Sequence, residues 1–111
     1  MSLKWKLYLA QVRYIDRGQS KLRPVLALSE PVGKFKIVLV APLYSTAVAE
    51  PLPGDVVLDN QTAELGIIRP STVRLHRITA VSIIQLQEQL GEVPPRLRGV
   101  VDGALKDLLD L

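Results

Sequence analysis

The order in which periodic patterns follow one another limits the fold of this chain more than any other feature. Five short β-type segments come first, separated by residues typical of turns, and helical periodicity begins only at Ser82. Parallel strands need a crossover helix between them, so strands gathered ahead of the helices favour a sheet built from hairpins. We therefore expect a mainly β fold, a small curled sheet or SH3-like small barrel with a C-terminal helix, rather than a βαβ fold.

Alternation and β-branched runs place the strands. Residues 3–14 alternate apolar and charged side chains, which predicts a strand with one buried face. Residues 24–28 begin at a proline and are otherwise apolar, so this strand should lie deep in the sheet and pair with residues 35–41 as a hairpin. Residues 42–54 hold three prolines and predict an irregular loop. Further strands are expected at residues 55–58 and 72–81.

Two helices are expected after the strands. In the first, Ser82 can cap the start and Gly91 the end of an apolar stretch with helical spacing. The second opens at Pro94-Pro95, and its apolar positions recur every three or four residues: Leu97, Val100, Val101, Ala104, Leu105 and Leu108. Gly99 and Gly103 within it either mark a close approach of backbones or only lower the helix propensity.

Size and composition narrow the class of protein. A chain of 111 residues can bury one hydrophobic core, so we expect a single domain over residues 1–111. The apolar runs are too short to span a membrane and no signal peptide is apparent, which favours a cytoplasmic protein. With no cysteine and one histidine, the chain offers neither disulfides nor a Cys- or His-rich metal site, and we expect no cofactor.

Basic residues are concentrated in the first third of the chain. Residues 1–40 carry eight of the fourteen Lys and Arg residues but only two of the eleven acidic residues, within a net charge of +3. A basic segment of this kind attracts polyanions such as RNA, although lysines on solvated strands would give the same count.

Several motifs follow one another in the order of a known family. Arg23-Pro24 precedes an apolar strand, and the next strand ends in Ala41-Pro42-Leu43. A proline-containing loop then leads to Asp55-Val56-Val57-Leu58, a Leu-Gly pair precedes a serine within residues 65–73, and another Leu-Gly pair lies within residues 89–93. Over residues 6–111 the chain resembles the MazF/PemK-like toxins, whose fold is an SH3-like barrel of the MazF/CcdB/Kid type.

The resemblance implies a function and a mechanism. Such toxins are homodimeric, metal-independent endoribonucleases that cleave single-stranded RNA by attack of the ribose 2′-hydroxyl, and an antitoxin protein restrains them. Arg23 matches the family's catalytic arginine, whose planar guanidinium suits the charge that develops on the phosphorane oxygens. The alternative for Arg23 is an ion pair with an acid on a neighbouring strand.

The chain departs from the family pattern at several positions. Tyr44 stands where the family has a threonine, and Ser45 and Thr46 follow at once, so any of the three can bring a hydroxyl to the phosphate. The family usually opens its first strand with Gly-Asp, where this chain has Trp5-Lys6, and the usual Gly-x-Glu pattern is missing before Arg23.

Further basic residues are candidates for RNA binding. Arg17 and Lys21 lie in and after the loop before Arg23, and Arg74 and His76 share one face of the strand expected at residues 72–81. His76 is either an acid or base in catalysis or a histidine on the surface of a strand.

Three functions are therefore weighed. The first is an active ribonuclease toxin, with Arg23 stabilising the phosphorane and Ser45 or Thr46 positioning it. The second is a catalytically degenerate member that binds an antitoxin or nucleic acid, which Tyr44 favours. The third is a poison of a DNA topoisomerase, since a related toxin branch acts through a Trp-containing C-terminus, but this chain ends in Leu108-Leu109-Asp110-Leu111.

Overall fold

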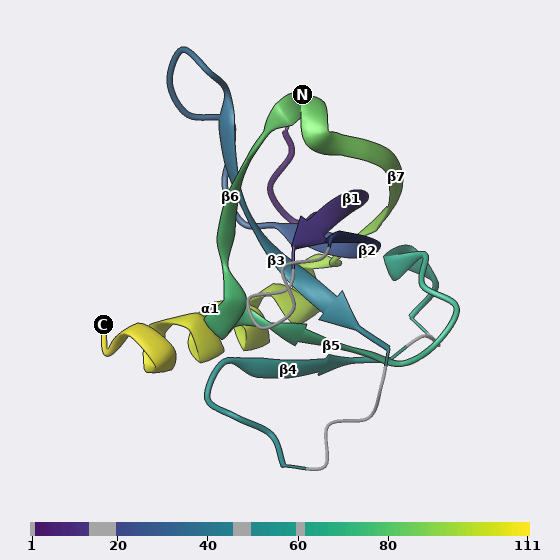
Figure 1. The fold of residues 1–111 in the computed structure, drawn as a ribbon. Coiled ribbons are helices and arrows are strands. Elements are labelled where there is room, and N and C mark those ends of the chain that lie inside the picture. The colour runs from purple at the N-terminus through teal and green to yellow at the C-terminus, as the bar shows by residue number, and fades with distance from the viewer. Residues whose placement is uncertain (1, 14–19, 46–49, 60–61) are drawn as a thin grey trace.

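An antiparallel sheet and a C-terminal α-helix are the main elements of the described residues (Figure 1). The computed structural model describes residues 2–13, 20–45, 50–59 and 62–111. Its strands are β1 Lys6–Arg13, β2 Ser20–Ala27, β3 Ile37–Tyr44, β4 Asp55–Leu58, β5 Ser71–Arg74, β6 Thr79–Ser82 and β7 Leu86–Glu92. Its helices are the 3₁₀ turns η1 Ala63–Leu65, η2 Leu75–Arg77 and η3 Ile83–Gln85, and the α-helix α1 Pro95–Leu109.

The strands follow the order β4-β5-β3-β2-β1-β7, and β6 pairs with the first half of β3. Within the described residues the two end strands, β4 and β7, do not pair with each other, so the sheet curls without closing. The prediction of a mainly β fold with a C-terminal helix is confirmed, with a strand arrangement that is barrel-like but open.

The predicted hairpin of two core strands is confirmed as β2 and β3, which pair antiparallel from Val25 opposite Pro42 to Ala27 opposite Val40. The predicted start of this strand at Pro24 is too late, because β2 begins at Ser20 and Pro24 lies inside it. Pro24 pairs with Leu9 of β1. Likewise β3 continues to Tyr44, so the predicted loop from residue 42 begins three residues too early.

Apolar side chains fill both faces of the sheet. Leu7 of β1 is fully buried in one cluster with residues of β2 to β5, and its neighbour Tyr8 is buried on the other side with Ala10 and Val12. The prediction of one buried face for the first strand is therefore wrong. A curled sheet wraps its concave face around one core, and its other face is here covered by β6 and η3, which pack against Tyr8 and its neighbours.

The region from residue 71 to residue 92 differs most from expectation. The strand predicted at 72–81 is split into β5 and β6 by η2, so that β5 pairs with the end of β3 and β6 with its first half. The helix predicted between Ser82 and Gly91 does not form: after the single turn η3 the chain continues as β7, which pairs with β1. Gly91 is needed there because a Cβ at this position would lie 2.3 Å from the carbonyl oxygen of Glu64.

The helix opened by Pro94-Pro95 is confirmed as the single helix α1, with Pro95 at its first position. Val101 is buried, and four further apolar residues pack against the core, namely Leu97, Ala104, Leu105 and Leu108. Val100 was expected on this face but is 58% exposed. A Cβ on Gly99 or Gly103 would meet no atom within 4 Å, so neither glycine marks a close approach.

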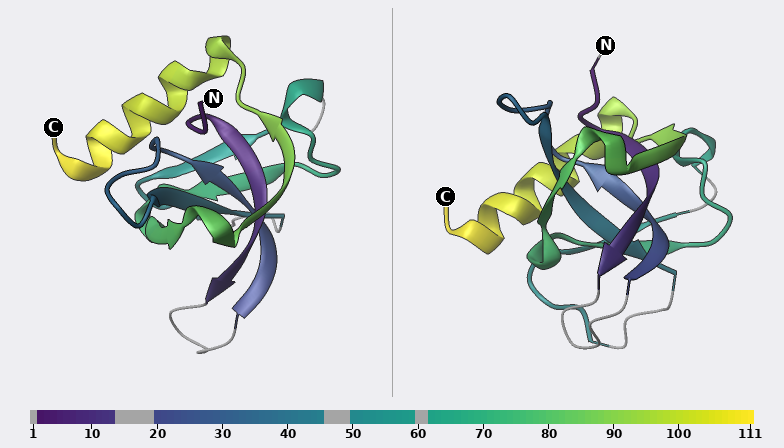
Figure 2. Two further views of the ribbon diagram at one scale, coloured as in Figure 1. Left: turned by 90° about the horizontal axis from the view of Figure 1, so that it is seen from above. Right: turned by 45° about the horizontal axis from the view of Figure 1, so that its top comes forward.

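Figure 2 shows α1 lying across one side of the sheet, where it contacts β4 and η2. No helix among the described residues is long and apolar enough to cross a membrane. The residues of the candidate site come from β2, the end of β3, β4, β5 and η2.

Candidate active site

Strand register brings residues of β2, β3 and β5 together at the end of β3. The β2–β3 pairing joins Val25 to Pro42, and continuing this antiparallel register by two residues sets Arg23 opposite Tyr44. On the other side of β3, Tyr44 pairs with Thr72 of β5. Residues directly opposite in antiparallel strands have their side chains on the same face, so Tyr44 meets side chains from both neighbours.

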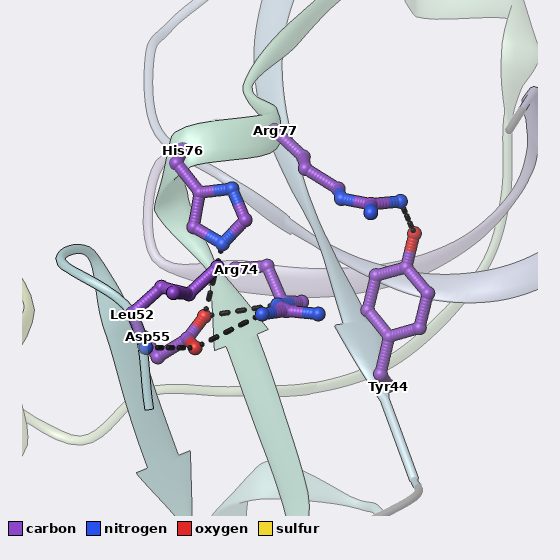
Figure 3. A network of polar contacts seen from close by, with 6 residues as sticks. All are labelled: Tyr44, Leu52, Asp55, Arg74, His76 and Arg77. Atoms are coloured by element: carbon purple, nitrogen blue, oxygen red, sulfur yellow. Dashed lines mark hydrogen bonds and ion pairs between the residues drawn. The ribbon is translucent and has the colours of Figure 1, made fainter. Parts of the chain in front are cut away.

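Three guanidinium groups surround the Tyr44 ring. The Cζ atom of Arg23 lies 4.3 Å from the ring centre, and those of Arg77 and Arg74 lie 5.5 Å and 5.9 Å from it. Nη1 of Arg77 also donates a hydrogen bond of 3.0 Å to the Tyr44 hydroxyl (Figure 3). Aromatic faces attract cations at these distances, so the ring holds three positive charges that would otherwise repel one another. We call this group the arginine cluster: Arg23, Arg74 and Arg77 around Tyr44.

Asp55 connects Arg74, His76 and the backbone of Leu52 by polar contacts. Asp55 is the first residue of β4 and pairs with Arg74 of β5, so the two side chains share one face. Oδ1 and Oδ2 of Asp55 accept hydrogen bonds from Nε and Nη2 of Arg74 at 3.0 and 3.1 Å. Oδ1 also lies 3.2 Å from Nε2 of His76, and Oδ2 accepts the backbone N–H of Leu52 at 2.8 Å (Figure 3).

The carboxylate of Asp55 is almost completely buried, with 2% of its side chain exposed. Burial acts to raise the pKa of Asp55, but hydrogen bonds from Arg74 and Leu52 and attraction to Arg74 and His76 outweigh it. The pKa of Asp55 is therefore lower than that of an ordinary aspartate, and the group is ionised at neutral pH.

The structure brings together some of the predicted site residues. Arg23, Tyr44 and Arg74 meet directly, and His76 joins them through Asp55. His76 lies in η2 and is half-buried, so the reading of a histidine on the surface of a strand does not hold. Arg23 donates a long hydrogen bond of 3.5 Å from Nη1 to the carbonyl oxygen of Leu43 on β3.

The other predicted residues lie apart from this cluster or outside the described residues. Lys21 is exposed on β2, opposite Val12 of β1. Ser45 is exposed and lines a separate pocket of about 360 Å³, together with Pro24. Arg17 and Thr46 lie outside the described residues.

Two functional candidates, Asp55 and Arg77, were not predicted from the sequence. Asp55 lies in the strand expected at residues 55–58, and alternation along an uninterrupted strand at residues 72–81 would set Arg77 on the face opposite Arg74. The turn η2 ends that alternation, so Arg77 points to the Tyr44 hydroxyl instead. An isolated acid at the start of a strand, with basic residues on a later strand, is the signal that was available for Asp55.

No group of three or more His, Cys, Asp or Glu side chains within the described part of the chain is placed to hold a metal ion. The site is instead rich in guanidinium groups, which bind phosphate oxygens through several N–H donors at once.

Comparison with known proteins assigns the chain to a family. Residues 4–109 match the family described as the PemK-like, MazF-like toxins of type II toxin-antitoxin systems. The chain is 34% identical over 111 residues to Endoribonuclease MazF2 of Mycobacterium bovis and, equally, to Endoribonuclease MazF6 of Mycobacterium tuberculosis. Each alignment covers 92% of this chain and 96% of the relative.

Solved structures agree with this assignment. The Mycobacterium tuberculosis toxin MazF-mt6 superimposes with a TM-score of 0.74 at 27% identity, over 96% of this chain and 97% of that one. A crystal structure of MazE-MazF from Deinococcus radiodurans gives a TM-score of 0.70 at 25% identity, over 96% and 94% of the two chains. Fold and site thus define a small antiparallel β protein with a guanidinium-rich site. The chain belongs to the PemK-like, MazF-like toxin family.

Proposed function

We propose that this protein is a toxin endoribonuclease that cleaves single-stranded RNA without a metal ion. The arginine cluster around Tyr44 is the observation that carries the proposal, because three guanidinium groups within 6 Å of one ring form a site for a phosphodiester. Family membership and the 34% identical relatives, which are named endoribonucleases, support the same reaction.

In the proposed reaction the 2′-oxygen of the ribose attacks the adjacent phosphorus and gives up its proton. A new bond from this oxygen to phosphorus forms, the bond from phosphorus to the 5′-oxygen breaks, and the leaving 5′-oxygen takes up a proton. The products are a 2′,3′-cyclic phosphate and a 5′-hydroxyl end. The nucleophile belongs to the substrate, so the reaction does not need a metal-bound water.

Arg23 is assigned the main catalytic role. The transition state carries extra negative charge on the phosphorane oxygens, and a guanidinium held in place beforehand stabilises that charge with little reorganisation. Arg23 is held by the Tyr44 ring and by the carbonyl oxygen of Leu43. Tyr44, Ser45 and Thr46 are the candidates for the hydroxyl that positions the phosphate, and His76 is a candidate for proton transfer.

The other predicted basic residues are assigned to RNA binding. Arg17 and Lys21 would contact phosphates along the strand, mainly through charge, and Lys21 is exposed to do so. Arg74 would contact a phosphate from within the arginine cluster, next to Arg23. Single-stranded RNA is thus the substrate, and a cytoplasmic location is part of the proposal, since RNA has to be accessible to the toxin.

An antitoxin protein and a second copy of the chain are the proposed partners. The related Deinococcus radiodurans toxin was solved as MazE-MazF. A homodimer is supported by the small size of the fold and by large apolar side chains left at its surface, such as Phe35 at 74% and Ile84 at 86% exposure. Size-exclusion chromatography with light scattering should give twice the monomer mass, and a strict monomer at micromolar concentration would contradict this part of the proposal.

A second function, a catalytically degenerate binding module, is favoured by one observation. Tyr44 stands in the family's threonine position, and its ring lies against Arg23 at 4.3 Å, so one face of the guanidinium is covered. In this case the protein binds RNA or an antitoxin but does not cleave.

Cleavage of a long unstructured RNA in excess EDTA separates the two functions. We expect cleavage by the wild type, and a rate for Arg23→Ala that is lower by about 10² to 10³, with RNA affinity much less affected. Arg96→Ala is the matched control, because Arg96 is an exposed arginine paired with Glu64 and lies outside the site. Loss of wild-type activity in EDTA with recovery in Mg²⁺ would refute the metal-free mechanism, and binding without cleavage would establish the module.

A further inference from the structure

Asp55 is a buried carboxylate that forms polar contacts with two candidate RNA-binding side chains, Arg74 and His76. It forms two hydrogen bonds to one edge of Arg74 and a third contact to His76, and only 2% of its side chain is exposed. Arg74 and His76 themselves remain partly accessible, at 16% and 22%. The acid is therefore hidden beneath the two groups that reach the surface.

We propose that Asp55 is a positioning residue, which fixes Arg74 beside the Tyr44 ring and holds His76 against its own Oδ1, so that Arg74 binds the RNA backbone at a defined place relative to Arg23. This inference rests on the proposed function. Asp55 itself does not touch the RNA, and its role is exerted through Arg74.

The geometry of the Arg74 guanidinium supports this role. A guanidinium has five N–H donors in one plane, and Asp55 engages two of them along the edge formed by Nε and Nη2. A two-point contact of this kind fixes both the position and the rotation of the plane. The remaining N–H groups then have set directions, with Cζ 5.9 Å from the centre of the Tyr44 ring.

Electrostatics alone predicts that removal of the Asp55 charge strengthens RNA binding. Loss of the Asp55 charge would make the site more positive, and a more positive site attracts RNA more strongly. Positioning predicts instead that cleavage at saturating RNA becomes slower, because misplacement by about 1 Å of a group that orients the reactants costs about 10²-fold in rate. A slower rate at saturating RNA therefore indicates positioning, whereas tighter binding with an unchanged rate indicates an effect of charge alone.

Asp55 also has a structural role that the experiment has to separate. Its Oδ2 accepts the N–H of Leu52 and so closes the turn that precedes β4. Asp55→Asn keeps one carbonyl oxygen, so the side chain can still accept that bond while it loses its charge. Rates are compared per folded molecule, at a temperature at which thermal unfolding shows every variant to be native.

The experiment is a double-mutant cycle on single-turnover cleavage at saturating RNA. We expect Asp55→Asn and Arg74→Ala each to slow cleavage by about 10²-fold, and the double variant to be no slower than either single variant. Glu64→Gln is the control, because Glu64 also holds an arginine by two hydrogen bonds, but at an exposed position. It should cleave like the wild type. Wild-type rates in Asp55→Asn, or losses that multiply in the double variant, would overturn the proposal.

A second readout does not depend on cleavage. In the wild type the N–H at Nε of Arg74 should give a slowly exchanging NMR signal, identified by its absence in Arg74→Lys, and Asp55→Asn should abolish that protection. If the wild type does not cleave RNA but shows this signal, the proposed function fails while the fixed position of Arg74 stands. If the signal is unprotected in the wild type, Asp55 does not position Arg74.

Discussion

The hydrogen bond between Tyr44 and Arg77 gives a prediction whose size follows from the structure. Tyr44→Phe removes only the hydroxyl that accepts Nη1 of Arg77 at 3.0 Å, and it keeps the ring on which Arg23 lies. A hydrogen bond to a charged group contributes about 1.5–3 kcal/mol when water is excluded. Both residues are half-buried, so water replaces part of the interaction, and we expect a coupling energy of about 1 kcal/mol.

The assay is urea unfolding of the wild type, Tyr44→Phe, Arg77→Ala and the double variant. The losses in free energy of unfolding of the two single variants should sum to about 1 kcal/mol more than the loss in the double variant. The same cycle with Arg96→Ala in place of Arg77→Ala should be additive, because Arg96 pairs with Glu64 elsewhere. Additivity of Tyr44 and Arg77 within about 0.3 kcal/mol would refute the account of the cluster.

Three further predictions concern affinity, packing and pH. Lys21→Ala should weaken RNA binding and lower the slope of log affinity against log salt by about one unit, with little change in the rate at saturation, as binding at several salt concentrations would show. In urea unfolding, Gly66→Ala should lower the free energy of unfolding by about 2–5 kcal/mol, because Gly66 has φ +66° and a Cβ would lie 2.0 Å from the carbonyl oxygen of Leu90. Gly99→Ala, in open space on α1, should instead raise the free energy of unfolding by about 0.5–1 kcal/mol. Because the pKa of Asp55 is lowered on folding, its contribution to stability should be complete above the ordinary aspartate pKa of about 4 and should be lost as the pH falls through the lowered value. In urea unfolding, the free energy of unfolding should therefore fall less between pH 6 and pH 2 for Asp55→Asn than for the wild type.

Local patterns predicted those elements that local interactions determine. The apolar run at 24–28, the β-branched run after Phe35 and the proline-initiated amphipathic helix at Pro95 each carry their own signal, and all three elements are present. Residues 82–91 carry a helical pattern as well, and Gln85 does accept a hydrogen bond from the backbone of Ser82. That bond supports one turn only, because pairing with β1 then extends the chain as β7.

The candidate site could be predicted in part for the same reason. Arg23 and Tyr44 were found through short motifs at strand ends, which are local in sequence. Asp55 and Arg77 depend on contacts 19 and 33 residues apart, to Arg74 and Tyr44, and these follow from strand register and from the turn η2. Neither the register of β4 against β5 nor the position of the break after Arg74 is encoded in a local pattern.

In the proposed reaction the arginine cluster promotes attack by the substrate's own 2′-hydroxyl. The most direct measurement uses an RNA with one cleavage site and the same RNA with a 2′-deoxy nucleotide at that site, both in EDTA. We expect cleavage of the first RNA to a 2′,3′-cyclic phosphate and a 5′-hydroxyl end, identified by mass spectrometry, and no cleavage of the second RNA. Cleavage of both substrates at that site would contradict this mechanism.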